Sequence, residues 1–388
     1  MSTIAAPRTR RVLRAVALFT FVGVTAAACG DDTSTADTTP TDATTDVIAT
    51  ESTTPDASTA ETVAGTTEGA ALSVDEVKLG FFPNVTHAPA LVGVAEGTFA
   101  DHLGDAKLST FTFDAGTEAA EALLAGSLDL TFIGPNPAIN AFAKSNGEAV
   151  RIVAGSTSGG AFLVVKPEIT SPEQLAGKKI ASPSLGNTQD VALRAWLKEQ
   201  GFETTPEGGG DVTVIPQKNS TTLESFIAGD IDGAWVPEPW ATRLIDEGGG
   251  TVLVDERDLW TATGGEFVTT HVLVRTEFLN DHPDAVKAIL QGLADAIDAI
   301  AADPAAAQAD VVAQIGEITG KDPGADVIAK SFASLTFTLD PIAASLQKSA
   351  DDAVAVGLLD PVELKGIHDL TLLNEILAER GQAEVTGL

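Results

Sequence analysis

The sequence has a single cysteine, Cys29, among its 388 residues. Without a second cysteine no disulfide can form within the chain, so the folded region must be stable through its core alone. The hydrophobic content of 44 % is sufficient for such a core, and the length allows two domains of ordinary size. A cysteine nucleophile and a zinc site built on cysteines are excluded.

Basic residues are scarce: 23 Lys and Arg stand against 55 Asp and Glu, and the formal net charge is −32. Nucleic acid is excluded as a partner, because binding its phosphates requires a basic face. A small anion is not excluded, since helix N-termini and neutral donors bind anions without net positive charge. We interpret the acidity itself as a solvated surface.

Motifs of catalysis and metal binding are also absent. The five histidines show no ligand spacing such as HxxxH. No GxSxG, Walker or GxGxxG pattern occurs, and spacing alone assembles no catalytic triad. The sequence therefore predicts a protein that is not an enzyme, with no metal and no cofactor. The histidines are His87, His102, His271, His282 and His368.

Residues 1–29 have the features of a targeting segment. Arginines precede an apolar run, residues 15–28, that is too short to span a membrane. The run ends in Ala-Ala-Ala-Cys and resembles a bacterial lipoprotein signal, which implies that Cys29 is lipidated and becomes the first mature residue. The alternative is a chance cysteine in a cleaved peptide. The Arg10-Arg11 pair also resembles a twin-arginine signal, so the export route stays open.

Residues 30–73 are rich in Thr, Ala, Asp and Ser and have no aromatic residue. Such a segment buries too little apolar surface to offset its ordering entropy, so we expect a disordered tether. Folded structure is expected to begin near residue 74.

The stretch KLGFFPNVTHAPALVGVAE predicts a strand (77–82), a polar turn (83–87) and a helix (88–95) with Thr86 as its cap. A helix N-terminus at the carboxyl end of a strand favours anion binding, because its free N–H groups and its dipole point outward. Similar strand–turn–helix units recur along the chain, which predicts parallel sheets with covered faces.

The remaining strands and helices are predicted from the period of the hydrophobic residues and from the turn residues between them. The segment after residue 282 carries helical patterns without a catalytic motif, and we interpret it as packing. Strands are expected at residues 108–113, 128–133, 149–154, 161–165, 179–181, 211–215, 231–235, 251–254 and 269–275. Helices are expected at residues 116–126, 138–144, 191–200, 221–227, 283–301, 304–318, 325–332, 342–356, 361–366 and 370–380.

Four stretches together resemble the periplasmic binding proteins for sulfonates, nitrate and taurine, which deliver substrate to ABC importers. They are GFFPNVTHAPALVGVAEGTF, AAEALLAGSLDLTFIGPNPAI, LAGKKIASPSLGNTQ and GDIDGAWVPEPWA, and the likeness covers residues 77–290. The resemblance implies an α/β fold of type II with two lobes, each a mostly parallel sheet covered by helices. Lobe 1 would comprise residues 74–163 and 270–388, lobe 2 residues 164–269, with hinge strands near residues 161–166 and 269–275.

The resemblance also implies that the ligand lies at the strand ends, where open α/β sheets bind ligands. In lobe 1, Asn84, Thr86 and His87 are expected to offer donors, and Asn136 follows the Gly134-Pro135 turn. Alternative readings are a surface histidine and an ordinary turn asparagine. Ser158 and Gly159, with Gly160, are expected to present backbone N–H groups as a nest, or to form a plain hinge linker.

In lobe 2, Asn187, Thr188 and Gln189 are expected at a helix start, where polar side chains and free N–H groups coincide. Trp235 is expected to form an aromatic wall of the pocket and Trp240 to pack in the core. Glu238 would repel an anion, so it binds a ligand amine, pairs with a base or faces solvent.

The leading hypothesis is a monomeric, lipid-anchored binding protein on the extracytoplasmic face of the membrane. It would capture a small oxyanion, in first place an aliphatic sulfonate, and pass it to ABC permease subunits. Nitrate, bicarbonate, taurine and a thiamine- or riboflavin-precursor ring are the alternatives. A pyrimidine-synthase-like enzyme is disfavoured, because its cysteine-rich motif is absent.

Overall fold

The computed structural model describes residues 72–388, which belong to one compact unit. The expected signal region with Cys29 and residues 30–71 of the expected tether lie outside the described residues. Within residues 72–388, no helix is both long enough and apolar enough to cross a membrane.

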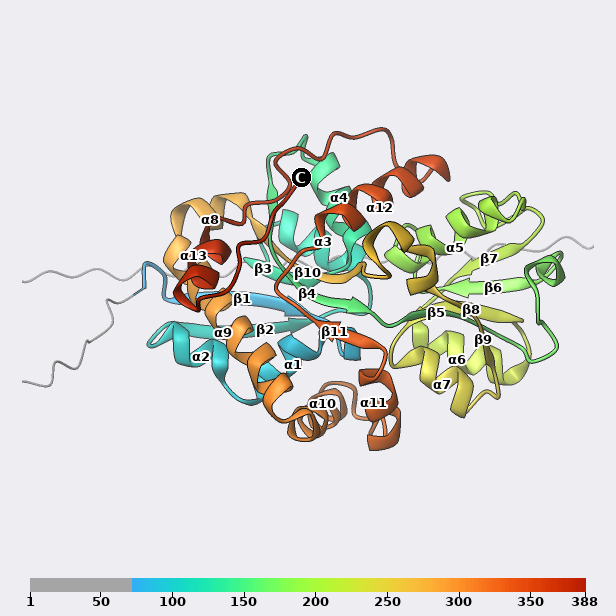
Figure 1. Cartoon of the computed structure of the whole chain (residues 1–388), viewed down its shortest axis with the longest axis horizontal. Coiled ribbons are helices and arrows are strands. Elements are labelled where there is room, and N and C mark those ends of the chain that lie inside the picture. Colours follow the sequence, from blue (N-terminus) through green and yellow to red (C-terminus); the bar gives the residue numbers. More distant parts are fainter. Residues whose placement is uncertain (1–71) are drawn as a thin grey trace, which may run out of the picture. The chain divides into compact units, whose positions relative to one another are not determined.

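Two β-sheets organise the described region (Figure 1). The first sheet has the order β11-β4-β10-β3-β1-β2, and the second has the order β7-β6-β8-β5-β9. The strands of the first are β1 (Glu76–Phe81), β2 (Lys107–Thr112), β3 (Leu130–Ile133), β4 (Val150–Gly159), β10 (Val268–Arg275) and β11 (Leu335–Phe337). Those of the second are β5 (Ala161–Val165), β6 (Lys179–Ser182), β7 (Thr213–Pro216), β8 (Gly233–Pro237) and β9 (Thr251–Asp255).

Both sheets are mixed, but β1, β2, β3 and β4 of the first sheet run in one direction, as do β6, β7, β8 and β9 of the second, so the expectation of mostly parallel sheets is confirmed. In the first sheet β1 pairs in parallel with β2 and β3, while β10 is antiparallel to β3 and β4, and β11 is antiparallel to β4. In the second sheet β6 is parallel to β7 and β8, while β5 is antiparallel to β8 and β9. β5 and β10, the first strand after each crossover between the sheets, run against these strands, and so does β11.

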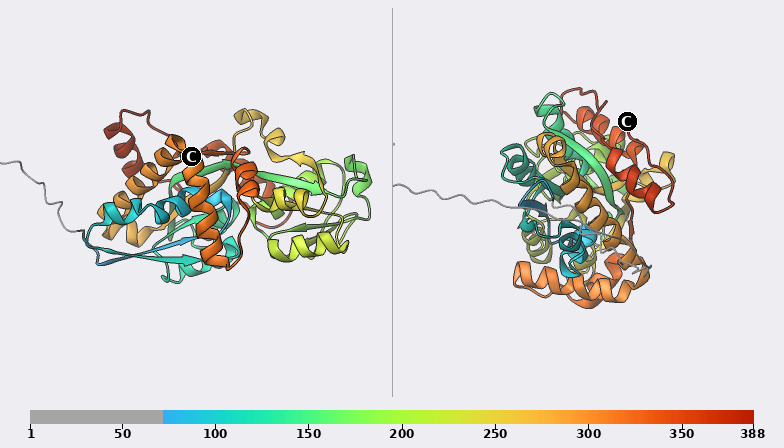
Figure 2. Two further views of the ribbon diagram at one scale, coloured as in Figure 1. Left: turned by 90° about the horizontal axis from the view of Figure 1, so that it is seen from below. Right: turned by 90° about the vertical axis from the view of Figure 1, so that its left-hand side faces the viewer.

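Helices cover both faces of the first sheet, and we call this part lobe 1 (Figures 1 and 2). Alternation along β10 shows why both faces are apolar: Val272 and Val274 join the cluster beneath α1 and α9, and Leu273 joins the cluster beneath α3, α4 and α12. The helices are α1 (Ala88–Ala95), α2 (Thr98–Leu103), α3 (Gly116–Leu124), α4 (Pro135–Lys144), α8 (Thr276–Asp281), α9 (Pro283–Ala302), α10 (Pro304–Thr319), α11 (Ala325–Phe332), α12 (Ala343–Ala355), α13 (Thr371–Glu379) and the 3₁₀-helix η1 (Val85–His87).

The second sheet, with its helices, forms lobe 2. On β5, Leu163 and Val165 pack on the α5 side, and Phe162 and Val164 pack on the α6 and α7 side. The helices are α5 (Thr188–Glu199), α6 (Asn219–Ala228), α7 (Trp240–Asp246) and the 3₁₀-helices η2 (Pro172–Leu175), η3 (Glu256–Leu259) and η4 (Thr261–Thr263). The predicted two-lobed α/β fold is thereby confirmed in its architecture, and the exact lobe limits stay a prediction.

The chain passes between the sheets twice, from β4 to β5 and from β9 through η3 and η4 to β10. At the first crossover Gly159 and Gly160 have φ of 83° and 70°. A Cβ on Gly160 would lie 2.2 Å from Leu335 Cδ2, so both backbone conformation and space require glycine there.

Several predicted elements differ from those observed. No helix forms at residues 361–366, where the prediction rested on six residues, too few to be helical without strong packing. The segments α2, α7, α8 and β11 were not predicted. β4 extends through Ser158 to Gly159 although Gly-Ser-Thr-Ser-Gly is a turn-like sequence, because β10 and β11 pair with it on both sides.

Candidate functional site

A small cavity, called here the inner cavity, lies between the lobes at the ends of their strands. Its volume of about 30 Å³ is roughly twice what one water molecule needs, so it holds a compact group. It is lined by Phe82, Asn84, Thr86, His87, Asp114, Ala115, Gly134, Pro183, Asn187, Thr188, Gln189, Asn219, Pro237 and Thr269. The lobes are close here: a Cβ on Gly134 would lie 2.5 Å from Thr188 Oγ1.

Five helices begin at the inner cavity. Their cap or first residues line it, namely His87 of α1, Ala115 of α3, Gly134 of α4, Asn187 of α5 and Asn219 of α6. None of the five N-termini receives a side-chain cap. The first N–H groups of a helix have no partner within it, and the helix dipole adds partial positive charge. The starts of α3, α5 and α6 therefore concentrate donors for an anion without a lysine or arginine in the lining, whereas Pro89 of α1 and Pro135 and Pro137 of α4 have no N–H to contribute.

Three polar atoms in this lining are buried and have no hydrogen-bond partner in the described part of the chain: His87 Nδ1, Thr188 Oγ1 and Asn219 Oδ1. His87 and Thr188 are only 3 % and 6 % exposed. An unsatisfied buried polar atom costs about 1–3 kcal/mol, and a ligand that bonds to it recovers this cost. The three atoms come from both lobes, so one small ligand would contact both.

Burial lowers the pKa of His87 to about 3. The imidazole is therefore neutral at ordinary pH, with one nitrogen that donates and one that accepts. Its ring packs on Phe82, with centroids 4.5 Å apart. The structure thus places His87 inside the cavity rather than on the surface.

The other two residues of this turn, Asn84 and Thr86, also line the inner cavity. Thr86 is not the predicted helix cap: the N-cap of α1 is His87, and no side chain caps it. Instead the Thr86 carbonyl accepts a hydrogen bond from Thr270 Oγ1 at 2.9 Å, which fixes the turn against β10. Asn84 Oδ1 accepts a hydrogen bond from Trp240 Nε1 at 3.0 Å, across the two lobes.

In lobe 2 the structure brings Asn187, Thr188 and Gln189 to the cavity, as predicted for their position. α5 begins at Thr188, three residues before the expected start, so these side chains belong to its cap and first turn. A buried ion pair holds this turn: Asp190 accepts hydrogen bonds from Ser182 Oγ at 2.6 Å, from the Gly186 N–H at 2.9 Å and from Arg194 Nε at 3.1 Å.

Asn136, Ser158 and Gly159 lie outside this lining. Asn136 stands in the first turn of α4 and its amide nitrogen donates to the Ser349 carbonyl at 2.9 Å. Ser158 and Gly159 belong to β4 rather than to a loop, and the Gly159 N–H donates to the Phe267 carbonyl. Gly159 therefore has no free N–H for the expected nest.

Trp235 differs from its expected place, whereas Trp240 packs against the core of lobe 2 as predicted and also reaches the other lobe. Trp235 is fully buried on the α5 face of β8, packs on Trp196 at 5.9 Å between ring centroids, and donates its indole N–H to Glu256 Oε2 at 2.7 Å. That makes it a core residue. Trp240 is partly buried against the lobe 2 core, and its indole N–H reaches Asn84 of lobe 1.

Glu238 is 4 % exposed and lies just before the N-cap of α7, Pro239. Its carboxylate accepts hydrogen bonds from the Thr242 N–H at 3.0 Å, from Thr242 Oγ1 at 2.8 Å and from Ser331 Oγ at 3.1 Å. Burial raises the pKa of Glu238, and these hydrogen bonds oppose the rise. The carboxylate is thus occupied by protein donors.

Sequence reasoning missed Asp114, Asn219 and Thr269 in the lining. Asn219 follows a strand and opens a helix, as Asn187 does, so the same strand–turn–helix signal was present. The predicted helix began at residue 221, two residues after the observed start of α6, so Asn219 was not recognised as a residue at a helix start.

Outside the inner cavity lies a larger opening of about 710 Å³, called here the outer vestibule. The two share Phe82, Asn84, Asp114 and Asn219. The vestibule lies between α6 and α7 of lobe 2 and the region around the end of α10 in lobe 1, with Trp240, Phe113 and Ile318 among its walls.

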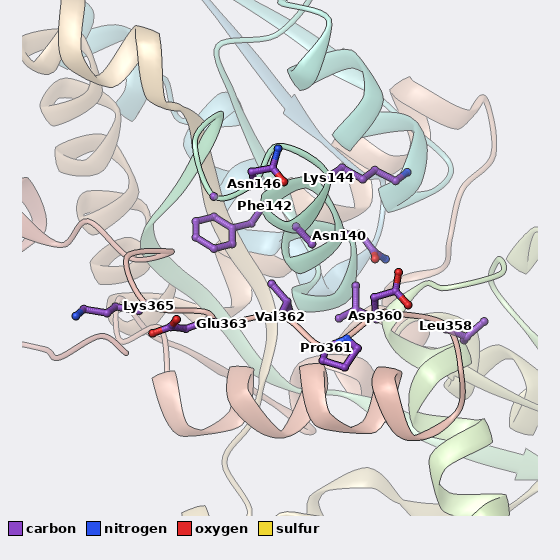
Figure 3. Close-up of a pocket in the computed structure, with 13 residues that line it drawn as sticks. Asn140, Phe142, Lys144, Asn146, Leu358, Asp360, Pro361, Val362, Glu363 and Lys365 are labelled. Carbon is purple, nitrogen blue, oxygen red and sulfur yellow. The ribbon is translucent and has the colours of Figure 1, made fainter.

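Another hollow, of about 810 Å³, lies elsewhere, between the end of α4 and residues 358–365 (Figure 3). Its labelled side chains do not converge on one point, and Lys365 and Glu363 lie at the end opposite Leu358. None of its lining atoms is among the buried unsatisfied atoms of the described residues. The inner cavity, although far smaller, has the chemistry of a binding site.

Comparison with solved structures identifies the fold as that of two-lobed periplasmic binding proteins. The alkanesulfonate-binding protein SsuA from Xanthomonas axonopodis pv. citri, bound to MOPS, matches with a TM-score of 0.60 and 19 % identity, over 74 % of this chain and 95 % of that one. The periplasmic nitrate-binding protein NrtA from Synechocystis PCC 6803 matches with a TM-score of 0.67 and 16 % identity, over 80 % and 90 %.

The chain belongs to the NMT1-like family, which it matches over residues 70–316. It is 32 % identical over 219 residues to the taurine-binding periplasmic protein of Escherichia coli (strain K12), covering 56 % of this chain and 64 % of that protein. It is 27 % identical over 294 residues to the nitrate/nitrite binding protein NrtA of Synechococcus elongatus, covering 69 % and 61 %. The chain thus matches less than two thirds of the length of these curated relatives.

Proposed function

We propose that this protein is a non-enzymatic solute-binding protein that captures a small oxyanion outside the cytoplasm and delivers it to an ABC importer. The observation that carries the proposal is the inner cavity, where five uncapped helix N-termini meet three buried unsatisfied polar atoms. Such a site binds an anion through neutral donors and dipoles. The names of the relatives, which bind taurine, nitrate or bicarbonate, agree with this chemistry.

Within this class we favour an aliphatic sulfonate. The inner cavity suits a compact head group, and the adjoining outer vestibule gives an organic tail a place to lie. Nitrate and bicarbonate would use the inner cavity alone. A thiamine- or riboflavin-precursor ring is the third alternative.

The mode of attachment forms part of the proposal. Lipid on Cys29 and the acidic, Thr-rich residues 30–73 would tether the binding protein, as a monomer, to the extracytoplasmic face of the membrane beside its permease subunits. Mass spectrometry of the protein extracted from membranes tests the anchor: the Cys29 peptide should carry acyl chains. An unmodified Cys29 in mature, membrane-associated protein would refute it.

A ligand screen tests the function. Ethanesulfonate, taurine, nitrate and bicarbonate, each added to the mature protein, are compared by denaturant unfolding and calorimetry, with choline chloride as a cationic control. A true ligand at about 100 times its dissociation constant should raise the free energy of unfolding by about 2.7 kcal/mol. If no anion shifts unfolding beyond the choline control, the proposal fails.

A further inference from the structure

We propose that Arg194 is a buried counter-ion of the anion site: it neutralises Asp190, a carboxylate directly behind the lining, and thereby sets how tightly the inner cavity binds an anion. Arg194 does not line the cavity and acts through Asp190, so it is a positioning residue. The inference rests on the proposed function and deepens it, because it assigns a charge balance to a site whose lining has no lysine or arginine.

The first turn of α5 carries a carboxylate as well as hydrogen-bond donors. Thr188 and Gln189 line the inner cavity, and their N–H groups are the first of the helix, without a partner inside it. Asp190 follows them, three residues past the N-cap, which is about 4.5 Å along the helix axis. A negative charge at this position repels a bound anion and competes with it for the positive end of the helix dipole.

The hydrogen bonds of Asp190 place its carboxylate beneath the loop that leads into α5. The carboxylate accepts from Ser182 Oγ and from the Gly186 N–H, and Pro183 and Asn187 of the same loop line the cavity. Asp190 is fully buried, so salt and water screen its charge little. Without a counter-ion, this carboxylate would lower the affinity of the inner cavity for any anion.

Arg194 supplies the counter-ion one turn further along α5. Its Nε lies 3.1 Å from Asp190 Oδ2, and the arginine is only 1 % exposed. Its Nη1 donates to the Thr205 carbonyl, and its Nη2 lies 3.5 Å from the Pro206 carbonyl oxygen. These three contacts hold the guanidinium behind the helix start, where its charge reaches the site only by way of Asp190.

The charge of Arg194 is directed mainly to Asp190. Among residues 72–388, Asp190 is the one carboxylate that forms an ion pair with it. Glu207 also lies within the electrostatic reach of Arg194, but Glu207 is exposed and water screens that interaction. The buried pair therefore leaves the start of α5 close to neutral, and its free N–H groups can act on an anion.

The sign of the change in affinity separates this role from plain support of the turn. Asp190→Asn removes the negative charge and leaves that of Arg194. Anion affinity should then rise about ten-fold, the effect of one unit charge about 10 Å away at an effective dielectric constant of about 20. Arg194→Met leaves Asp190 without a counter-ion and should lower the affinity by a similar factor. The double variant, which removes both charges, should bind nearly like the wild type.

Calorimetry on the mature protein measures these affinities with ethanesulfonate, taurine, nitrate and bicarbonate, and urea unfolding measures stability in parallel. Asp190→Asn should bind the anion more tightly and yet unfold more easily, because it leaves a buried charge unpaired. A merely structural role would lower both quantities. If Arg194→Met does not fold, Asp190→Asn and the double variant still decide, since removal of both partners of a buried pair is often tolerated.

Asp352→Asn is the matched control. Asp352 also pairs with a basic residue one helical turn away, Lys348 of α12, with Oδ2 and Nζ 2.6 Å apart. Neither residue lines the inner cavity or the outer vestibule. This variant makes the same change in charge and should leave anion affinity unchanged.

The outcomes separate this inference from the proposed function. If the wild type binds an anion and Asp190→Asn binds it no more tightly, the counter-ion inference is wrong and the anion-binding function stands. If none of the four anions binds to the wild type, the proposed function itself is wrong, and the inference falls with it.

Discussion

At His87, burial decides the chemistry of a side chain that the sequence could place either on the surface or in the site. The ring is 3 % exposed and its pKa falls to about 3 because charging it there would forfeit hydration. A neutral imidazole donates one N–H to an anion, so anion binding at this residue does not require an acidic pH. The same burial leaves Nδ1 without a partner, which only a bound molecule can supply.

Thr188→Val is the sharpest test at this scale. Valine keeps the shape of threonine and removes Oγ1, an atom with no protein partner, so the free energy of unfolding should not fall. Affinity for the anion should fall by about ten- to one hundred-fold, the worth of a hydrogen bond to a charged group. Calorimetry and urea unfolding measure the two quantities.

Thr222→Val is the matched control. Thr222 is 1 % exposed and its Oγ1 is also unsatisfied, but it lies on α6 outside the inner cavity lining. This variant should bind the anion like the wild type. If both variants lose affinity alike, Thr188 does not contact the ligand.

Among the elements, β8 and η3 meet at a buried pair, the Trp235 indole and the Glu256 carboxylate. Burial raises the pKa of Glu256 to about 7, and the hydrogen bond from Trp235 opposes the rise. The ordinary pKa of this carboxyl, which applies to the unfolded chain, is 4.5. Between pH 4.5 and 7 the folded protein therefore keeps the Glu256 proton, while the unfolded chain releases it. This group therefore stabilises the fold less as pH rises through that window.

Glu256→Gln should remove this pH dependence while its amide oxygen still accepts the Trp235 N–H. Relative to the wild type, the free energy of unfolding of the variant should rise by about 1–3 kcal/mol between pH 5 and pH 7.5. Urea unfolding of both proteins at both pH values measures this difference. The buried histidines, whose contribution to stability changes with pH in the opposite direction, are the same in both proteins, so their contribution cancels. Parallel profiles for the two proteins would contradict a titrating Glu256.

The same elements show where prediction from sequence succeeds. The apolar positions of α9 recur with helical period, so its predicted limits, 283–301, differ by one residue from those observed. β4 was cut short at residue 154, since the polar run that follows is stabilised by two partner strands that no local pattern reveals. Trp235 was assigned to the pocket because strand alternation alone does not tell which face carries α5.

At the scale of the whole molecule, two polar contacts join the lobes. Trp240 of lobe 2 donates to Asn84 of lobe 1 beside the cavity, and Lys330 of lobe 1 pairs with Asp246 of lobe 2 at 2.7 Å. Closure around a ligand is a hinge motion, so a bond between the lobes stabilises the closed state and slows ligand release.

A double-mutant cycle on Asn84 and Trp240 measures that bond. Trp240→Phe keeps an aromatic ring beneath Arg243 and removes the indole N–H, and should weaken anion affinity about five-fold, the value of a neutral hydrogen bond. Asn84→Ala also loses any direct ligand contact, so the cycle isolates the coupling, expected at about 1 kcal/mol. A coupling near zero would show that the bond does not contribute to closure.

The sequence by itself determined the alternation of strands and helices, the α/β class, the likeness to two-lobed binding proteins and the turns that carry Asn84, His87 and Asn187, because hydrophobic period and turn residues act locally. Only the tertiary structure decided which turns meet. The structure places Asn219 and Thr188 with His87 in the inner cavity lining and places Asn136 and Trp235 outside it. It also leaves three buried polar atoms of that lining unsatisfied, since burial and partners depend on segments far apart in the chain.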